Sequence, residues 1–126
     1  MVTGGASGIG YAIAQRLSQA GVSVMIADRE EENAIAAAES LGADGAEVVA
    51  VRADVTRLED IAAMVERTLE TFGRLDILVN NAGINGRNAP LWEVTDEEWE
   101  GLMAINLTSV FRCCQAVTCA SRAAAQ

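Results

Sequence analysis

Three glycines near the start of the chain have the spacing of a phosphate-binding loop. Residues 3–10 read TGGASGIG, so that Gly4, Gly8 and Gly10 directly precede an amphipathic helical pattern. Glycine lets the backbone approach a pyrophosphate closely, and the N–H groups at a helix start favour an anion. Glycine-rich turns also serve simply as strand-to-helix connections, so the loop predicts dinucleotide binding only together with partners further along the chain.

The first such partner is a carboxylate. Asp28 ends an apolar run 18 residues after Gly10, where a carboxylate can accept both ribose hydroxyls of an adenosine and repel a 2′-phosphate. Asp28 and Glu31 also fit a capping pair for the following helix, and both roles can coexist. Arg29 could partner a 2′-phosphate, but the carboxylate beside it favours NAD over NADP.

Amides and a second carboxylate follow later apolar runs. Asp54-Val55 follows the third predicted strand and Asn80-Asn81-Ala82-Gly83 the fourth. Both segments are expected at the carboxyl edge of a parallel sheet, where ligands bind in this architecture. The small residues leave room for a cofactor, and the amides can tie neighbouring loops together. Taken singly, a polar loop residue or a strand-ending turn explains each segment equally well.

Asn106 is a polar residue within the apolar helical pattern Ile105-Asn106-Leu107. A polar side chain in such surroundings needs a hydrogen-bond partner. In isolation, a satisfied structural amide is the plainer interpretation.

Several side chains with useful chemistry are absent. The chain contains no His and no Lys, and Tyr11 is its only tyrosine. Its three cysteines (Cys113, Cys114 and Cys119) have neither CxxC spacing nor a His to complete a metal site. We therefore expect no metal, and we interpret the cysteines as small apolar helix residues of a cytoplasmic protein.

The elements that must position these residues alternate between helix and strand. The predicted strands are Val22–Ala27, Glu47–Val51 and Leu75–Asn80, and the predicted helices are Ile9–Ala20, Asp28–Leu41, Thr56–Gly73 and Thr95–Phe111. Capping boxes at Thr56–Glu59 and Thr95–Glu98 begin the last two helices, and Asn85–Pro90 reads as a loop. Helices alternating with short apolar strands predict one α/β domain with a doubly wound parallel sheet.

The pattern is incomplete at both ends. Only Met1–Thr3 are available for a strand before the glycine loop, although strands usually need about five residues. Beyond Val117 the apolar stripe gives way to a small-residue tail. We therefore expect residues 1–126 to form a partial domain.

Composition restricts the partners. A net charge of −9 with scattered arginines argues against nucleic acids and anionic membrane surfaces, which both attract basic patches. No signal peptide is visible, and we expect no apolar run long enough to span a bilayer.

Taken together, residues from Thr3 to about Val117 resemble the short-chain dehydrogenase/reductase family, whose fold is Rossmann-type. The resemblance rests on the glycine loop, Asp28, Asp54-Val55, the NNAG segment and Asn106. It implies a set of cofactor-binding residues: Gly4, Ser7, Gly8, Ile9, Gly10, Asp28, Arg29, Asp54, Val55, Asn81, Ala82 and Gly83.

In that family, a hydride passes between a nicotinamide and a small-molecule alcohol or carbonyl. A Tyr transfers the proton, a Lys tunes the Tyr, a Ser positions the substrate and an Asn anchors a water. Only Asn106 matches one of these four, because the Tyr-x-x-x-Lys pair and its Ser are absent and Tyr11 follows the glycine loop. The resemblance also makes the helix beginning at Thr95 a candidate contact between subunits.

Three functional interpretations fit these features of the sequence. The chain could be the cofactor-binding portion of an NAD-dependent oxidoreductase, inactive alone. It could be a catalytically silent NAD-binding module or a partner of full-length relatives. It could also be a non-functional remnant.

Overall fold

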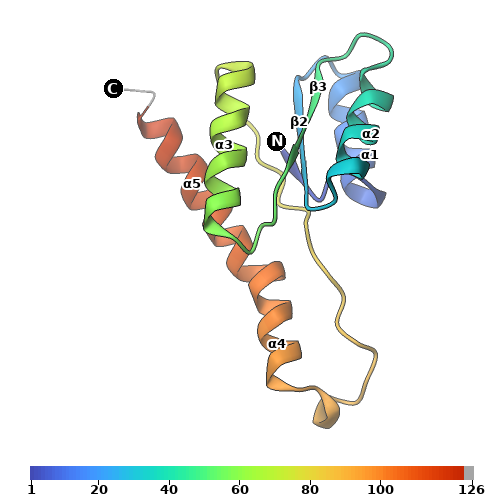
Figure 1. The fold of residues 1–126 in the computed structure, drawn as a ribbon, viewed down its shortest axis with the longest axis vertical. Coiled ribbons are helices and arrows are strands. Elements are labelled where there is room, and N and C mark those ends of the chain that lie inside the picture. The colour runs from blue at the N-terminus through green and yellow to red at the C-terminus, as the bar shows by residue number, and fades with distance from the viewer. Residues whose placement is uncertain (124–126) are drawn as a thin grey trace.

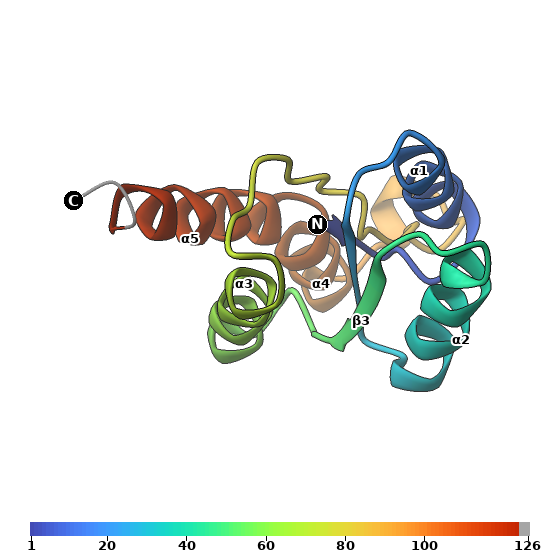
Figure 2. The ribbon, with the colours of Figure 1, turned by 90° about the horizontal axis from the view of Figure 1, so that it is seen from above.

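The computed structural model describes residues 1–123, and helices cover both faces of a small parallel sheet (Figures 1 and 2). In chain order the elements are β1 (Val2–Thr3), α1 (Gly8–Gln19), β2 (Val24–Asp28), α2 (Glu31–Gly42), β3 (Val48–Arg52), α3 (Leu58–Phe72), the 3₁₀ turn η1 (Leu91–Glu93), α4 (Asp96–Met103), the π-helical segment η2 (Ala104–Thr108) and α5 (Ser109–Ala123). This arrangement confirms the predicted α/β doubly wound class.

The sheet has the order β1-β2-β3, with parallel pairs such as Val2 opposite Ile26. The segment after α3 runs along the other side of β1. Met1 N donates to Ile77 O at 2.8 Å, and Thr3 N donates to Val79 O at 3.0 Å. The first strand therefore lies between β2 and the segment that contains Val79.

The predicted strand Leu75–Asn80 is wrong in extent. Only Val79 forms a bridge, and its partner is Val2. The physical reason is the length of β1, because a two-residue strand offers a neighbour too few backbone groups for a ladder. The shortness of the first strand, which the sequence predicts, therefore limits the length of the strand beside it.

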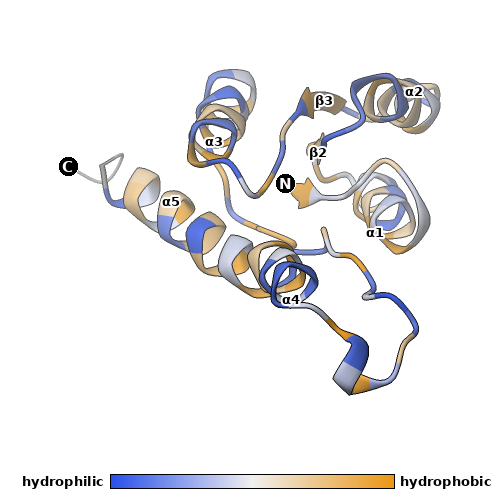
Figure 3. Ribbon diagram, turned by 60° about the horizontal axis from the view of Figure 1, so that its bottom comes forward, coloured by the Kyte–Doolittle hydropathy of each residue, from blue (hydrophilic) through white to orange (hydrophobic). Residues whose placement is uncertain are grey.

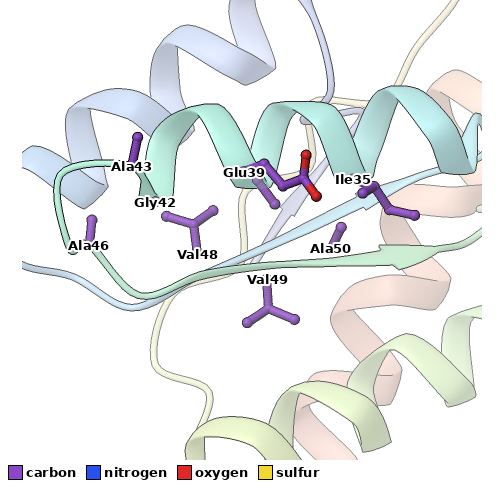
Figure 4. A pocket seen from close by; sticks show the side chains of 9 residues that line it. Ile35, Glu39, Gly42, Ala43, Ala46, Val48, Val49 and Ala50 are labelled. Carbon is purple, nitrogen blue, oxygen red and sulfur yellow. The ribbon is translucent and has the colours of Figure 1, made fainter.

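Strand periodicity divides the core into two clusters. Val24 and Ile26 of β2 pack with the alanines of α1 and α2, whereas Met25 and Ala27 pack with α3 and α5. Figure 4 shows the same alternation in β3, where Val48 points toward α2 and Val49 points away from it. Side chains alternate between faces in a strand, so a sheet covered on both faces needs the near-continuous apolar runs seen in the sequence.

Of the two predicted capping boxes, one forms. Thr95 Oγ1 accepts from Glu98 N at 3.2 Å, and Glu98 Oε2 accepts from Thr95 N at 2.9 Å. The Thr56 box is wrong, because α3 begins at Leu58 after Arg57. The Thr56 hydroxyl instead donates to Asp54 Oδ1 at 2.7 Å.

The predicted Asp28–Glu31 capping pair is also wrong. Helix α2 begins at Glu31 with Glu30 as its N-cap residue, and no side chain caps it. Asp28 is the last residue of β2, and its carboxylate bonds the glycine loop as well as Glu30 N. The Asp28 carboxylate, which the local pattern assigns to the helix, therefore bonds the glycine loop instead.

The last helix is longer than predicted. Elements α4, η2 and α5 join into one helix that continues past Phe111 to Ala123. By length and composition alone, the stretch Asp96–Arg122 could cross a membrane, so the expectation that no segment reaches that length is wrong. Core helices of soluble proteins meet the same criteria. In Figure 3 this helix carries polar and apolar residues around its axis, whereas the short β1 arrow is strongly hydrophobic.

Candidate functional site

A cleft of about 580 Å³ opens at the carboxyl ends of the strands. Its lining residues are Gly4, Ser7, Gly8, Ile9, Asp28, Arg29, Glu30, Ala53, Asp54, Val55, Thr56, Asn81, Ala82, Gly83, Ile84 and Ile105. Every residue predicted to bind the cofactor lines this cleft except Gly10. Four loops separated in sequence therefore converge on one site, where ligands bind in open α/β sheets.

Gly4 and Gly10 allow the loops to approach one another closely. Gly4 has a φ of +61°, and a Cβ there would lie 2.9 Å from Ala82 Cα. A Cβ on Gly10 would overlap the Gly4 carbonyl oxygen and lie 2.5 Å from Asn81 Nδ2. Gly10 thus supports the cleft from behind, which explains its absence from the lining.

Gly8 serves a different purpose. Its φ is +54°, and a Cβ there would meet no protein atom within 4 Å, because the cleft lies beyond it. Ser7 is the N-cap residue of α1, but its side chain caps no amide. The first amides of a helix lack intrahelical partners, so the start of α1 offers free N–H donors to an anion in the cleft.

Asp28 is held in place by two backbone amides. Its Oδ2 accepts from Ala6 N at 3.1 Å, and its Oδ1 accepts from Glu30 N at 3.2 Å. The neighbouring Arg29 forms an ion pair with Glu30, with 3.3 Å between Nε and Oε1. This end of the cleft therefore presents fixed negative charge, and its one arginine is already paired.

Asp54 has its own set of donors. Its Oδ1 accepts from Thr56 Oγ1 at 2.7 Å and from Thr56 N at 2.9 Å. These hydrogen bonds favour the charged form, so the pKa of the Asp54 carboxyl lies below its usual value. Asp60 Oδ2 accepts from Asp54 N at 2.9 Å, which fixes the backbone as well.

Asn81 ties the glycine loop to the segment after Val79. Its Nδ2 donates to Thr3 O and to Gly4 O, both at 3.0 Å. The prediction that these amides connect neighbouring loops is confirmed for Asn81. Asn80 instead points toward α5, with 3.4 Å between its Nδ2 and Cys114 Sγ.

Asn106 lies in the π-helical segment η2 and binds the loop that follows Gly83. Its Oδ1 accepts from Ile84 N, and its Nδ2 donates to Ile84 O, both at 2.8 Å. The predicted need for a hydrogen-bond partner is confirmed. Asn106 does not line the cleft itself, but Ile84 and Ile105 do. The π-helical turn was not predicted from the sequence.

Sequence reasoning missed four lining residues: Glu30, Ala53, Thr56 and Ile105. Each adjoins a predicted site residue in the sequence. Their only signal was this position beside a strand end or beside Asn106, and several are small or apolar.

Other reactive groups lie outside the cleft. Tyr11 pairs with Ser40 across α1 and α2, with 3.2 Å between the hydroxyl oxygens. Burial raises the pKa of the Cys113 thiol to about 11, which keeps it protonated. Within residues 1–123 no group of His, Cys, Asp or Glu side chains gathers as a metal site.

A second hollow of about 510 Å³ lies between α2 and β3 (Figure 4). Alanines, valines, Gly42 and Ile35 line it, and Glu39 is its only charged residue. It lacks the converging polar groups that orient a ligand, so it is not the candidate site.

Comparison with known families gives one extended match. The family described as short chain dehydrogenase matches residues 1–124. The chain is 46% identical to 3beta-hydroxysteroid dehydrogenase 2 of Eggerthella lenta over 110 residues, which are 87% of this chain and 42% of that protein. It is 41% identical to 5-keto-D-gluconate 5-reductase of Escherichia coli over 118 residues, which are 94% and 46% of the two chains. It thus spans less than half the length of these curated relatives.

Solved structures agree with the sequence match. A metagenomic short-chain oxidoreductase in complex with NADP has a TM-score of 0.89 and 36% identity, covering 98% of this chain and 56% of that one. Actinorhodin polyketide ketoreductase with NADPH, an F189W variant, has a TM-score of 0.88 and 39% identity, covering 92% and 44%. In both solved structures the matching region is about half of the chain.

Proposed function

The chain belongs to the short-chain dehydrogenase family, and we propose that it is the cofactor-binding portion of an NAD-dependent oxidoreductase. The complete reaction moves a hydride between the nicotinamide and a small alcohol or carbonyl substrate. The observation that carries this proposal is the convergence of the glycine loop, Asp28, Asp54 and the NNAG segment on one cleft.

The order of the strand ends supports one orientation of the dinucleotide. Asp28 and Asp54 follow β2 and β3, and the glycine loop follows β1. Adenosine would then lie over Asp28 and Asp54, and the pyrophosphate at the start of α1. The nicotinamide end falls near Ile84, beyond the glycine loop.

We propose NAD rather than NADP because of the charge at the adenosine end. A 2′-phosphate there would face the Asp28 carboxylate, which two backbone amides hold in place. Arg29, the basic residue that lines the cleft, already pairs with Glu30. The solved relatives above contain NADP or NADPH, so the proposal of NAD rests on Asp28 of this chain and not on those relatives.

Taken alone, the 126-residue chain is expected to bind the dinucleotide without turnover. General acid–base catalysis needs a group of suitable pKa within hydrogen-bond reach. Tyr11 bonds Ser40 outside the cleft, and the sequence contains no lysine to tune it. Asn106 is the one candidate member of the catalytic set, and it needs the others from elsewhere.

Further expectations concern partners and location. The apolar residues Trp99, Leu107 and Phe111 are exposed along the last helix, and we propose this helix as a contact between copies. We expect neither nucleic acid nor membrane as a partner, because the net charge is −9 and the helix packs on α3 through buried Cys113. A cytoplasmic location accords with its free thiols.

The first experiment is thermal unfolding of the purified chain with and without millimolar NAD. A ligand that binds only the folded state raises stability by RT ln(1 + [L]/Kd), so even weak binding shifts the transition. We expect a cooperative transition that NAD raises. A broad transition that does not respond to nucleotide would favour the non-functional remnant.

Calorimetric titration with NAD and NADP then tests the choice of cofactor. Wild type should bind NAD more tightly than NADP. Asp28→Ser removes the carboxylate and should therefore bring the Kd values of the two cofactors closer together. Tighter binding of NADP by wild type would contradict the proposed preference. Absence of NAD reduction with a panel of alcohols, despite binding, is the expected outcome for the chain alone.

A further inference from the structure

We infer that Arg87 and Glu98 form a clasp that positions the loop 84–95 beside the nicotinamide end of the cleft. Arg87 is then a positioning residue, which acts through Ile84 rather than on a ligand directly. The inference about the cleft rests on the proposed function, whereas the clasp itself is a property of the chain without ligand.

Arg87 makes two hydrogen bonds to Glu98 in α4 and one to the end of η1. Its Nε donates to Glu98 Oε1 at 2.8 Å, and its Nη2 donates to Glu98 Oε2 at 3.4 Å. The same Nη2 donates to Glu93 O at 2.8 Å. Forked contacts of this kind fix direction as well as distance, so they hold one orientation of the loop.

Glu98 serves the loop and the helix at the same time. Its Oε2 also accepts from Thr95 N, which completes the capping box of α4. Together the Arg87 and Thr95 donors lower the pKa of Glu98 to about 2. The carboxylate therefore stays charged throughout the physiological pH range.

The clasp lies at a suitable distance from Ile84. Asn106 and Glu98 are eight residues apart, or about 12 Å along a helix. Ile84 and Arg87 are three residues apart, which an extended chain spans in about 10 Å. Ile84 bonds Asn106 while Arg87 bonds Glu98, so this part of the loop is attached to the last helix at two levels.

Few other polar contacts hold the loop. In Figure 1 it leaves the sheet, descends to η1 at the bottom of the view and returns as α4. Leu91 and Trp92 of η1 are exposed, the latter by 86%. Across residues 1–123, the polar contacts that join this loop to the last helix come from Ile84, Arg87 and Thr95.

Loss of the contact between Arg87 and Glu98 should therefore make the nicotinamide end of the cleft more mobile and leave the adenosine end unchanged. Ile84 lines the cleft, and its backbone is held by Asn106 only while the loop stays near the helix. The adenosine end is built on Asp28 and Asp54, whose partners lie in other segments. Loss of the clasp should therefore weaken the binding of NAD but not the binding of a ligand that occupies only the adenosine end.

The first test measures hydrogen exchange of the Ile84 amide by NMR, without ligand. Arg87→Met should raise its exchange rate on the order of threefold, the scale of one exposed ion pair. Glu98→Gln should act similarly, because Gln preserves a capping box but lacks the charge. Arg74→Met is the matched control, since Arg74 makes an equally close fork with Asp76 outside the cleft. Unchanged Ile84 exchange in Arg87→Met would overturn the clasp.

The second test compares the Kd values of NAD and AMP. Arg87→Met should weaken NAD on the order of threefold and leave AMP unchanged, and Arg87→Lys should restore part of the loss. Equal weakening of both ligands would mean a general structural effect and would overturn the positioning role. If wild type binds neither nucleotide while the exchange result holds, the proposed function fails and the clasp stands.

Discussion

Two regions that border the cleft are built by opposite means. The cofactor cradle, residues 3–10 with 81–83, is held by part-buried hydrogen bonds from the Asn81 side chain to the backbone. Its packing leaves no room for an added atom at Gly10. The outer arm, loop 84–95 with α4, is held by a few exposed polar contacts. Thr3 in the cradle is 2% exposed, whereas Trp92 in the arm is 86% exposed.

This difference shows which region owes its conformation to contacts within the described chain. The cradle obtains its geometry from packing within this sequence, so its shape should be insensitive to anything outside it. The arm exposes large apolar side chains, which globular proteins usually cover. Its conformation therefore depends more on its few exposed hydrogen bonds and ion pairs.

The largest expected effect comes from adding one methyl group to each region. Gly10→Ala would place its Cβ against Gly4 O and Asn81 Nδ2, so we expect destabilisation of about 3 kcal/mol or more. Gly101→Ala in α4 meets no atom within 4 Å and should stabilise the helix by roughly 0.5–1 kcal/mol. Urea unfolding measures both. If both substitutions changed the unfolding free energy equally, the cradle would not be more tightly packed than the arm.

The two adjacent asparagines give the next largest contrast. Asn81→Ala leaves Thr3 O and Gly4 O without a donor, which should cost about 1–3 kcal/mol of unfolding free energy. Asn80→Ala removes only a long contact with Cys114 and should change stability by less than about 0.5 kcal/mol. Denaturant titration of the two variants measures both changes in unfolding free energy. Equal losses in the two variants would contradict a specific role of Asn81 in the cradle.

A smaller, pH-dependent effect is expected at Asp54. Its pKa is depressed in the folded chain by Thr56, so its contribution to stability is present above the unfolded pKa and is lost as pH falls through the folded pKa. Thr56→Val removes the side-chain donor. The stability difference between wild type and Thr56→Val should therefore shrink as pH falls below about 4. Urea unfolding across a pH series checks this, and a difference that grows on acidification would contradict it.

The smallest effect on stability is expected in the last helix. Phe111 is 65% exposed, so Phe111→Ser should change the unfolding free energy by less than about 0.5 kcal/mol. If this helix joins copies, the same change should reduce concentration-dependent association in sedimentation experiments. Arg67→Ser, at an exposed position of α3, is the control. Unaltered association in Phe111→Ser would argue against the helix as an interface.

Much of the site could be predicted because its residues follow apolar strands. Parallel strands bring their carboxyl ends to one edge, so Asp28, Asp54 and Asn81 were expected together before their contacts were known. Local capping patterns were less reliable. Thr95 and Glu98 cap α4 although Arg87 also bonds the Glu98 carboxylate, because its two oxygens can serve both partners. Asp54 instead accepts from Thr56, and Asp28 accepts from the backbone amide of Ala6.

Residue types and spacing were enough to predict the class of fold, the alternation of helices and strands, and the position of the glycine loop, and they show that the chain has no lysine. Each follows from residue type and spacing, which are local properties of the chain. Tertiary structure alone decided that Gly10 supports the cleft from behind, that Asn106 sits in a π-helical turn bonded to Ile84, and that Arg87 reaches Glu98. Those contacts join segments whose separation in space depends on how every intervening helix packs, and no local pattern encodes that distance.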